Sequence, residues 1–191
     1  MFVLLFKLKR KIKQVFKKQS SSFKLFEWRT IYSNRFFPGK GMSFGKLFAV
    51  YFDASSSVIR IGEGVQFRDF CQLRSGMNGS LVIGERVFFN NNCSINCMHE
   101  IVIGNDCQFG EGVKFYDHNH QYKNKAVKIN EQGYATGRIL VGNNCWFGSD
   151  VIILKDVEIG DNVIIGAGCI IHQSIPSNSK IINIQQIGQL S

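Results

Sequence analysis

The chain has 191 residues, of which 45% are hydrophobic and 19% charged. That length and composition suit one well-buried domain and exclude a disordered chain. The net charge of +9 is concentrated in residues 1–40, which hold 11 of the 23 Lys and Arg with Glu27 as their only acid. Because a nucleic-acid-binding domain usually carries basic residues over its own binding face, we expect no nucleic-acid partner. No run approaches the ~18 apolar residues typical of a membrane-spanning helix.

Residues 1–40 form a basic appendage. Apolar residues recur there at helical spacing with Lys and Arg between them, which predicts an amphipathic basic helix. Attachment to an anionic membrane surface and packing on the open end of the main domain are both open roles for it, with partner binding as a third. The apolar positions are Leu5, Leu8, Ile12 and Val15 or Phe16.

The rest of the appendage is expected to connect this helix to the domain. Residues 19–22 resemble a break, because three of the four are serines. The aromatic-rich residues 23–37 are expected to pack on the domain, and residues 38–41 to form a closing turn.

From Ile61 onward an aliphatic or aromatic residue returns every six positions, often followed by Gly. A period of six matches neither a helix nor a plain strand, and it is typical of a parallel β-helix in which each short strand ends in a sharp turn. Four residues after twelve of these lead positions stands a Val, Ile or Cys. The lead positions are Ile61, Phe67, Leu73, Ile83, Phe89, Ile95, Ile103, Phe109, Phe115, Val141, Phe147, Ile153, Ile159, Ile165 and Ile171.

The same repeat explains the cysteines. Five of the six occupy the position that Val holds elsewhere, so we expect small buried hydrophobes with free thiols, which fits a reducing, cytoplasmic compartment. Cys97 is outside this register, and no CxxC pair exists. The five in register are Cys71, Cys93, Cys107, Cys145 and Cys169.

Three segments carry a resemblance to a known family: Phe115 to Tyr122 (FYDHNHQY), residues 141–149 (VGNNCWFGS) and residues 165–171 (IGAGCII). They resemble the sugar O-acetyltransferases of the hexapeptide-repeat acyltransferase family, such as galactoside and maltose acetyltransferases and capsule-modifying relatives. The resemblance covers about residues 58–178 and implies an all-β solenoid, a left-handed parallel β-helix with three strands per coil. We therefore expect an appendage over residues 1–40, a β-helix domain over 41–180 and a C-terminal cap over 181–191.

The resemblance also implies a catalytic histidine. The family places it five residues after a lead position, just before an extruded loop, and counting from Phe115 this is His120. A sugar hydroxyl is a poor nucleophile, so a base must remove its proton as it attacks the thioester, and histidine suits that role. His118 is the fallback. Asp117 either orients an imidazole or simply forms a turn.

The donor side of the site is implied in the same way. Gly148 and Ser149 match the turn that the family uses for the oxyanion, through a backbone N–H or the serine hydroxyl. Ser149, Gly166 and Ala167 are expected to line the thiol arm of acetyl-CoA, the co-substrate, and no metal is expected. The chain departs from the family after this segment: His172 and Gln173 replace the usual TK, and the GNPAK tail is absent.

Residues 121–138 leave the repeat, which predicts an extruded loop. In related enzymes such an arm encloses the active site between neighbouring subunits, so the resemblance implies a homotrimer. Asn90, Asn92, Trp146 and Tyr122 are the expected acceptor contacts. A plain turn role stays open for the asparagines, and exterior packing stays open for Trp146.

The sequence thus predicts a cytoplasmic, trimeric, acetyl-CoA-dependent O-acetyltransferase. Its expected acceptor is a sugar hydroxyl of a surface polysaccharide or its precursor, and the basic helix would allow peripheral contact with the inner face of the membrane. One rival is a carbonic-anhydrase-like hexapeptide protein with zinc on His99, His118 and His120. The other is a catalytically inactive scaffold or membrane-docking β-helix.

Overall fold

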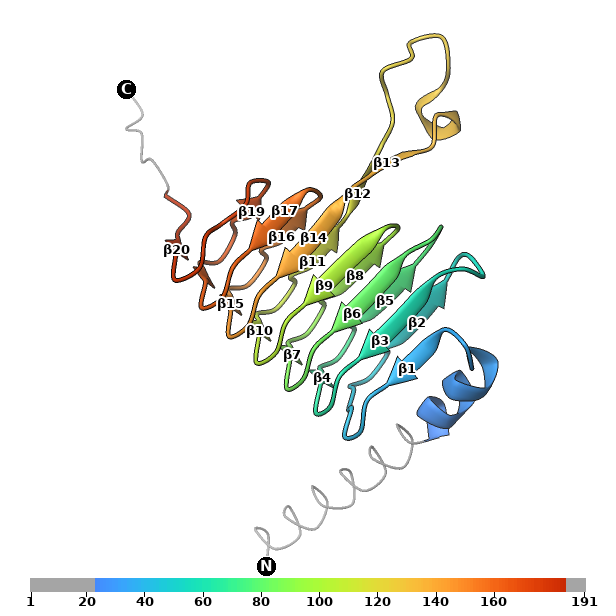
Figure 1. The fold of residues 1–191 in the computed structure, drawn as a ribbon, viewed down its shortest axis with the longest axis vertical. Coiled ribbons are helices and arrows are strands. Elements are labelled where there is room, and N and C mark those ends of the chain that lie inside the picture. Colours follow the sequence, from blue (N-terminus) through green and yellow to red (C-terminus); the bar gives the residue numbers. More distant parts are fainter. Residues whose placement is uncertain (1–22, 185–191) are drawn as a thin grey trace, which may run out of the picture.

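The computed structural model describes residues 23–184, which build a solenoid of about six turns with three parallel six-stranded sheets as its faces (Figure 1). Sheet A has the order β1 (Phe36–Pro38), β3 (Val58–Ile61), β6 (Ser80–Ile83), β9 (Glu100–Ile103), β14 (Arg138–Val141), β17 (Val157–Ile159). Sheet B has the order β20 (Lys180–Ile181), β18 (Ile164–Ile165), β15 (Trp146–Phe147), β10 (Gln108–Phe109), β7 (Phe88–Phe89), β4 (Gln66–Phe67). Sheet C has the order β19 (Ile170–Ile171), β16 (Ile152–Leu154), β11 (Lys114–Tyr116), β8 (Ser94–Cys97), β5 (Gln72–Ser75), β2 (Ala49–Phe52).

The chain passes from sheet A to sheet B to sheet C and back to sheet A in each coil. Every strand therefore pairs with the equivalent strand one coil away, as β10 does with both β7 and β15. The turns between the sheets stack into three columns, which we call the A–B, B–C and C–A edges. The parallel β-helix expected from the six-residue repeat is confirmed.

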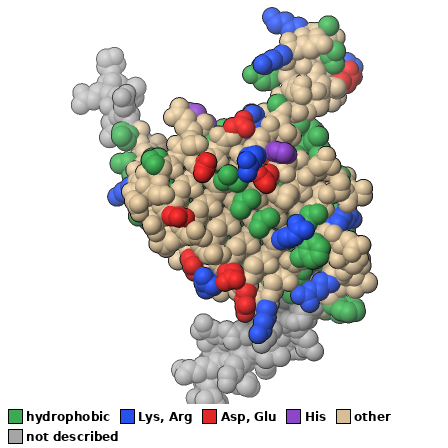
Figure 2. All heavy atoms as spheres, viewed as in Figure 1, with side chains coloured by type: hydrophobic (Ala, Val, Ile, Leu, Met, Phe, Trp, Pro, Cys, Tyr) green, Lys and Arg blue, Asp and Glu red, His purple; other side chains and the backbone are tan. Residues whose placement is uncertain are grey.

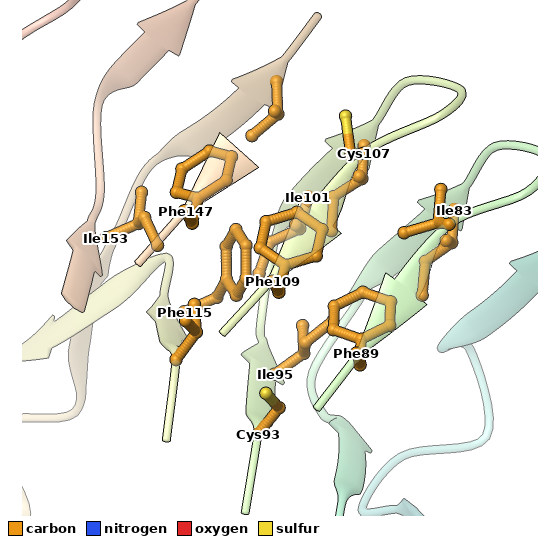
Figure 3. Packing of buried hydrophobic residues seen from close by; sticks show 14 of the residues in the cluster. Ile83, Phe89, Cys93, Ile95, Ile101, Cys107, Phe109, Phe115, Phe147 and Ile153 are labelled. Atoms are coloured by element: carbon orange, nitrogen blue, oxygen red, sulfur yellow. The ribbon is translucent and has the colours of Figure 1, made fainter. Parts of the chain in front are cut away.

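The core is built from the repeat positions. All twelve Val, Ile and Cys residues that follow the lead positions are buried. Between them runs a column of aromatic rings from successive strands of sheet B (Figure 3). The ring centroids of Phe67, Phe89, Phe109 and Phe147 are 4.6 to 4.7 Å apart from one to the next. That spacing equals the ~4.8 Å rise between adjacent strands, so each coil adds one ring to the column.

The cysteines behave as the repeat predicts. All six, Cys97 included, are buried and free. Cys97 ends β8 and lies in register with Ser75 of β5, outside the valine positions. The thiols of Cys107 and Cys145 donate to the backbone oxygens of Gly142 and Gly160, each at 3.2 Å. These two thiols therefore find hydrogen-bond acceptors in the backbone of the neighbouring coil.

A helix over residues 23–31 closes the N-terminal end of the solenoid. Its Trp28 packs on three core rings, with centroid distances of 5.4 to 5.9 Å to Phe44, Phe48 and Phe36. The expectation that this stretch packs on the domain is confirmed. The first strand, β1, already pairs with β3, so the coil begins a few residues before the expected boundary at residue 41.

Several sequence-based expectations lie outside the described residues. They are the amphipathic helix over residues 5–16, the break at residues 19–22 and the last seven residues of the C-terminal cap. In the described range 23–184, no helix is both long and apolar enough to cross a bilayer.

One arm leaves the solenoid between sheets C and A, as the break in the repeat predicts (Figure 1). It consists of β12 (His118–His120), the 3-10 helix η1 (Ile129–Glu131) and β13 (Tyr134–Thr136), with β12 and β13 antiparallel. The Gly137 N–H donates to the Asp117 backbone oxygen at 2.7 Å and closes the arm at its base. The arm thus begins before residue 121, and both histidines lie on its first strand.

Candidate active site

The two histidines share one face of the arm. His118 pairs with Thr136 and His120 with Tyr134, and residues two apart on a strand point to the same side. The Tyr134 ring lies between them: its centroid is 5.3 Å from that of His118, nearly perpendicular, and 4.6 Å from that of His120. Tyr134 is a residue that the sequence analysis missed, since its position opposite His120 depends on the pairing of two strands 14 residues apart.

Asp117 anchors this group from inside the solenoid. Its side chain is fully buried, and both carboxylate oxygens accept the Met98 N–H at 2.9 Å. Oδ2 also accepts the His99 N–H at 2.8 Å, and Oδ1 lies 2.9 Å from His118 Nδ1. Burial by itself raises the pKa of Asp117, but the hydrogen bonds from His118 and from the His99 and Met98 amides outweigh it and hold that pKa below its usual range. Asp117 is therefore a buried anion that contacts His118 and not His120.

The two imidazoles differ in their surroundings. The His118 side chain is 14% exposed and held on Asp117. His120 is exposed, and neither of its ring nitrogens has a hydrogen-bond partner among the described residues. His120 lines a cavity of about 350 Å³ together with Asn119, Gln121, Tyr122, Lys123, Ala135 and Lys155.

Cys97 lies close to Asp117 and is the one buried thiol near the histidines. Burial raises the pKa of Cys97 strongly, and the neighbouring Asp117 charge adds to this effect. A thiol that resists ionisation is a poor nucleophile. Cys97 is therefore poorly suited to a covalent role.

The predicted donor-side residues form a second group, on the B–C edge. Gly148 and Ser149 follow β15, and Gly166 and Ala167 stack on them one coil later. Gly148 is buried, whereas the Ser149 and Ala167 side chains are exposed. The edge therefore presents short side chains and open backbone to solvent on two consecutive coils.

The B–C edge differs from the A–B edge in the hydrogen bonds that side chains make to the backbone N–H groups of the turns. On the A–B edge four successive turn amides are capped by a side-chain oxygen of the next coil, at 2.6 to 2.9 Å. These pairs are Glu85 N–H with Asn105, Asn105 N–H with Asn143, Asn143 N–H with Asp161 and Asp161 N–H with Ser177. On the B–C edge the Asp69 side chain accepts the Lys46 N–H in the same way, and the Asn91 side chain accepts the Asp69 N–H.

On the later coils of the B–C edge, after the one that contains Asn91, the equivalent turn amides have no such side-chain cap among the described residues. In the described chain the N–H groups of Glu111, Ser149 and Ala167 have neither a side-chain nor a backbone acceptor. Unpaired amides must be satisfied by water or by a ligand. Two of the three belong to residues that the sequence analysis assigned to the thioester and the coenzyme, which makes this edge a row of free donors.

The expected acceptor contacts divide between the two groups. Tyr122 lines the arm cavity with His120. Asn90 and Asn92 lie in the B–C turn after β7, where the Asn90 side chain accepts the Asn91 N–H at 2.9 Å and Asn92 donates to Glu111 at 3.1 Å. Trp146 stands on the outer face of sheet B, 55% exposed, in register with Gln108 and Ile164.

One chain does not bring the two groups together. The histidines leave the solenoid at the C–A edge, after β11. Ser149 lies on the B–C edge, before β16, which is the sheet C strand one coil later. A reaction that uses both groups needs a second chain to bring its B–C edge to the arm.

The three histidines of the zinc alternative are not gathered into a ligand set. Over residues 23–184 no group of three His, Cys, Asp or Glu side chains is arranged to hold a metal ion. His99 contributes its backbone N–H to Asp117, and His118 Nδ1 faces the same carboxylate. His172 is exposed, as expected.

Comparison with known proteins agrees with the motifs. Residues 138–173 match the family model of the bacterial transferase hexapeptide, which has six repeats. Galactoside O-acetyltransferase of Escherichia coli (strain K12) is 35% identical over 96 residues, which are 50% of this chain and 46% of that protein. The chain spans about half the length of the curated relatives it matches. The resemblance to hexapeptide-repeat transferases is confirmed.

Solved structures show the same fold. A variant N-acyltransferase from Bacillus cereus, in complex with dTDP and coenzyme A, has a TM-score of 0.66 and 18% identity over 82% of this chain and 83% of that chain. A hexapeptide-repeat acetyltransferase from Vibrio cholerae, complexed with acetyl coenzyme A, has a TM-score of 0.53 and 17% identity over 89% and 83%.

Proposed function

We propose that this chain, which carries the bacterial transferase hexapeptide repeat, is an acetyl-CoA-dependent O-acetyltransferase that acts on a sugar hydroxyl. The observation that carries the proposal is the loss of backbone caps at Ser149 and Ala167 on the B–C edge. Two free amides one coil apart can bind carbonyl oxygens along an extended acyl-pantetheine arm. The short side chains of this edge fit such a ligand.

The proposed reaction is a direct transfer. A histidine of the arm takes the proton of the sugar hydroxyl while its oxygen attacks the thioester carbonyl. The Ser149 N–H donates to the oxyanion of the tetrahedral intermediate. The C–S bond then breaks, and the proton passes from the imidazole to the leaving thiolate. His120 is the base that the family resemblance implies, with His118 as the alternative.

We propose a homotrimer, which the placement of the two groups supports. Since the arm and the B–C edge belong to different edges of the solenoid, a cyclic assembly can bring the arm of one chain against the B–C edge of the next. The exposed residues Tyr122, Val127 and Ile129 on the projecting arm, whose tip also carries lysines (Figure 2), supply apolar surface for that contact. Each site then needs two chains.

A sugar acceptor is proposed on two grounds: the similarity to galactoside O-acetyltransferase and the lining of the arm cavity. That cavity is lined by amides, a tyrosine and lysines, which can hydrogen-bond hydroxyl groups. A surface polysaccharide or its precursor is the proposed class. Location in the cytoplasm, at the inner face of the membrane, is a proposal that rests on the basic residues 1–20.

Thiol release from acetyl-CoA with a panel of neutral, acidic and amino sugars tests the activity. We expect release with at least one sugar and background release for the double variant His118→Ala with His120→Ala. Background release with every sugar, or release unchanged in the double variant, would contradict the proposal and favour an inactive scaffold. Zinc content of the purified protein tests the carbonic-anhydrase-like alternative.

Co-sedimentation with vesicles tests the membrane contact separately. The full chain is expected to bind vesicles containing anionic lipid, and a chain lacking residues 1–20 is expected not to. Equal binding by both would contradict a membrane role for this segment.

A further inference from the structure

Asp117 needs an explanation beyond turn formation. It is a fully buried carboxylate, and all its contacts are donors: the amides of Met98 and His99 and the ring of His118. A buried anion is costly unless it is paired and hydrogen-bonded. The His118 ring, 2.9 Å away, and the buried Cys97 thiol are the side chains beside it.

This contact fixes the state of the His118 ring. An ionised carboxylate can only accept hydrogen bonds, so the proton of the neutral imidazole must lie on Nδ1. Nε2 then carries the lone pair. Nε2 can therefore accept a proton while Nδ1–H stays on the carboxylate.

The ring is also fixed by packing. Tyr116 and Tyr134 lie 6.5 and 5.3 Å from it, both nearly perpendicular to its plane. Asp117 on the inner side and Tyr134 on the arm therefore hold His118 in one orientation while 14% of its side chain stays exposed. His120 has no comparable restraint: among the described residues its ring packs on the Tyr134 ring and its nitrogens have no hydrogen-bond partner.

We propose that Asp117 is a positioning residue that holds His118 as its Nδ1–H tautomer, so that Nε2 of His118 is the base of the proposed acetyl transfer. His120 then lines the acceptor cavity. The inference rests on the proposed function for its catalytic part, and its structural part concerns the protein without ligands.

The structural part is tested by long-range ¹H–¹⁵N spectra of the full chain labelled on histidine, with no ligand added. His118→Gln and His120→Gln assign the two signals. We expect neutral His118 to carry its proton on Nδ1 in the wild type, and on Nε2 in Asp117→Asn, whose amide donates to Nδ1. Neutral His118 protonated on Nε2 in the wild type would overturn the proposal, and this result needs no folded Asp117 variant.

The catalytic part uses the acceptor identified by thiol release. His118→Ala is expected to lower kcat by about 10²–10⁴-fold, with part of the loss restored by added imidazole. His120→Ala is expected to act mainly on the KM for the acceptor. A large loss of kcat in His120→Ala with an active His118→Ala would overturn the assignment.

The Asp117→Asn variant distinguishes a role of Asp117 in positioning His118 from a role in stabilising the fold alone. If it folds with wild-type circular dichroism and assembly size, its kcat should fall by about 10²-fold or more while the KM for acetyl-CoA stays constant, because a wrong tautomer removes the base without removing the binding edge. Unchanged kcat in the folded variant would contradict a positioning role. If the wild type releases no thiol with any acceptor, the proposed function fails, whereas the tautomer is still decided by the spectra.

Discussion

A Cβ atom placed on Gly148 would lie 2.5 Å from the backbone nitrogen of Ala167 on the next coil. No flexible side chain is involved, so the backbone itself would have to move. Gly148→Ala is therefore expected to destabilise the fold by about 1–3 kcal/mol through overpacking and to displace the Ala167 N–H. Denaturant unfolding and acetyl-CoA titration measure the two effects.

Gly76→Ala is the matched control for this variant. Its added Cβ would meet Asp53 Oδ2 at 3.4 Å, an ordinary contact, in a turn far from the proposed coenzyme edge. We expect near wild-type stability and acetyl-CoA affinity. Equal stability and affinity of Gly148→Ala and the wild type would contradict the role given to this close approach.

The column of phenylalanine rings predicts a second effect. The rings of Phe89 and Phe109 are 4.6 Å apart with an interplanar angle of 12°, and both are fully buried. Phe109→Ala is expected to cost about 3–5 kcal/mol of unfolding free energy, and Phe109→Leu considerably less. Urea unfolding measures both, and an Ala variant no less stable than the Leu variant would show that the column contributes little.

The buried thiols predict tolerance of valine. Cys107 and Cys145 occupy positions that other coils fill with Val, and on substitution each loses only weak thiol contacts with two backbone oxygens. Cys107→Val and Cys145→Val are expected to change the unfolding free energy by less than about 1.5 kcal/mol. All six thiols should react with a thiol reagent only after unfolding. Rapid labelling of the native protein would contradict their structural assignment.

The lowered pKa of Asp117 predicts a pH dependence of stability. Because the folded-state pKa lies below the unfolded value of about 3.9, the contribution of Asp117 is complete above that value and is lost as the pH falls through the folded-state pKa. Wild-type protein should lose more stability than Asp117→Asn between pH 6 and pH 3, with exposed Glu131→Gln as the control. Parallel acid profiles for wild type and Asp117→Asn would refute this assignment.

The six-residue period was enough to predict the coil, because all fifteen lead positions, and the residue four positions after twelve of them, are buried as the pattern requires. The first strand, β1, could not be predicted from the repeat. Pro38 pairs with Ile61 and stands at the equivalent of a lead position, but a Pro-Gly pair is typical of a turn. Proline is tolerated there because β1 is the edge strand of sheet A.

The site could be predicted only in part. The histidines, Ser149 and Ala167 stand in motifs that can be seen along the chain. The role of Asp117 depends on amides 18 and 19 residues earlier, which only the stacking of coils brings beneath it. In the same way, the start of the arm and the contact of Tyr134 with both histidines follow from the pairing of β12 with β13. No repeat position encodes that pairing.

The central claim is that the arm of one chain and the B–C edge of another form one acetyl-transfer site. Co-expression of His118→Ala chains with Ala167→Trp chains, in which the indole blocks the exposed edge, tests it most directly. Each variant alone should be inactive, and the mixed assembly should recover about a quarter of wild-type thiol release, since random cyclic assembly joins an intact arm to an intact edge at that frequency. No recovery in mixed assemblies of wild-type size would contradict a site shared between chains.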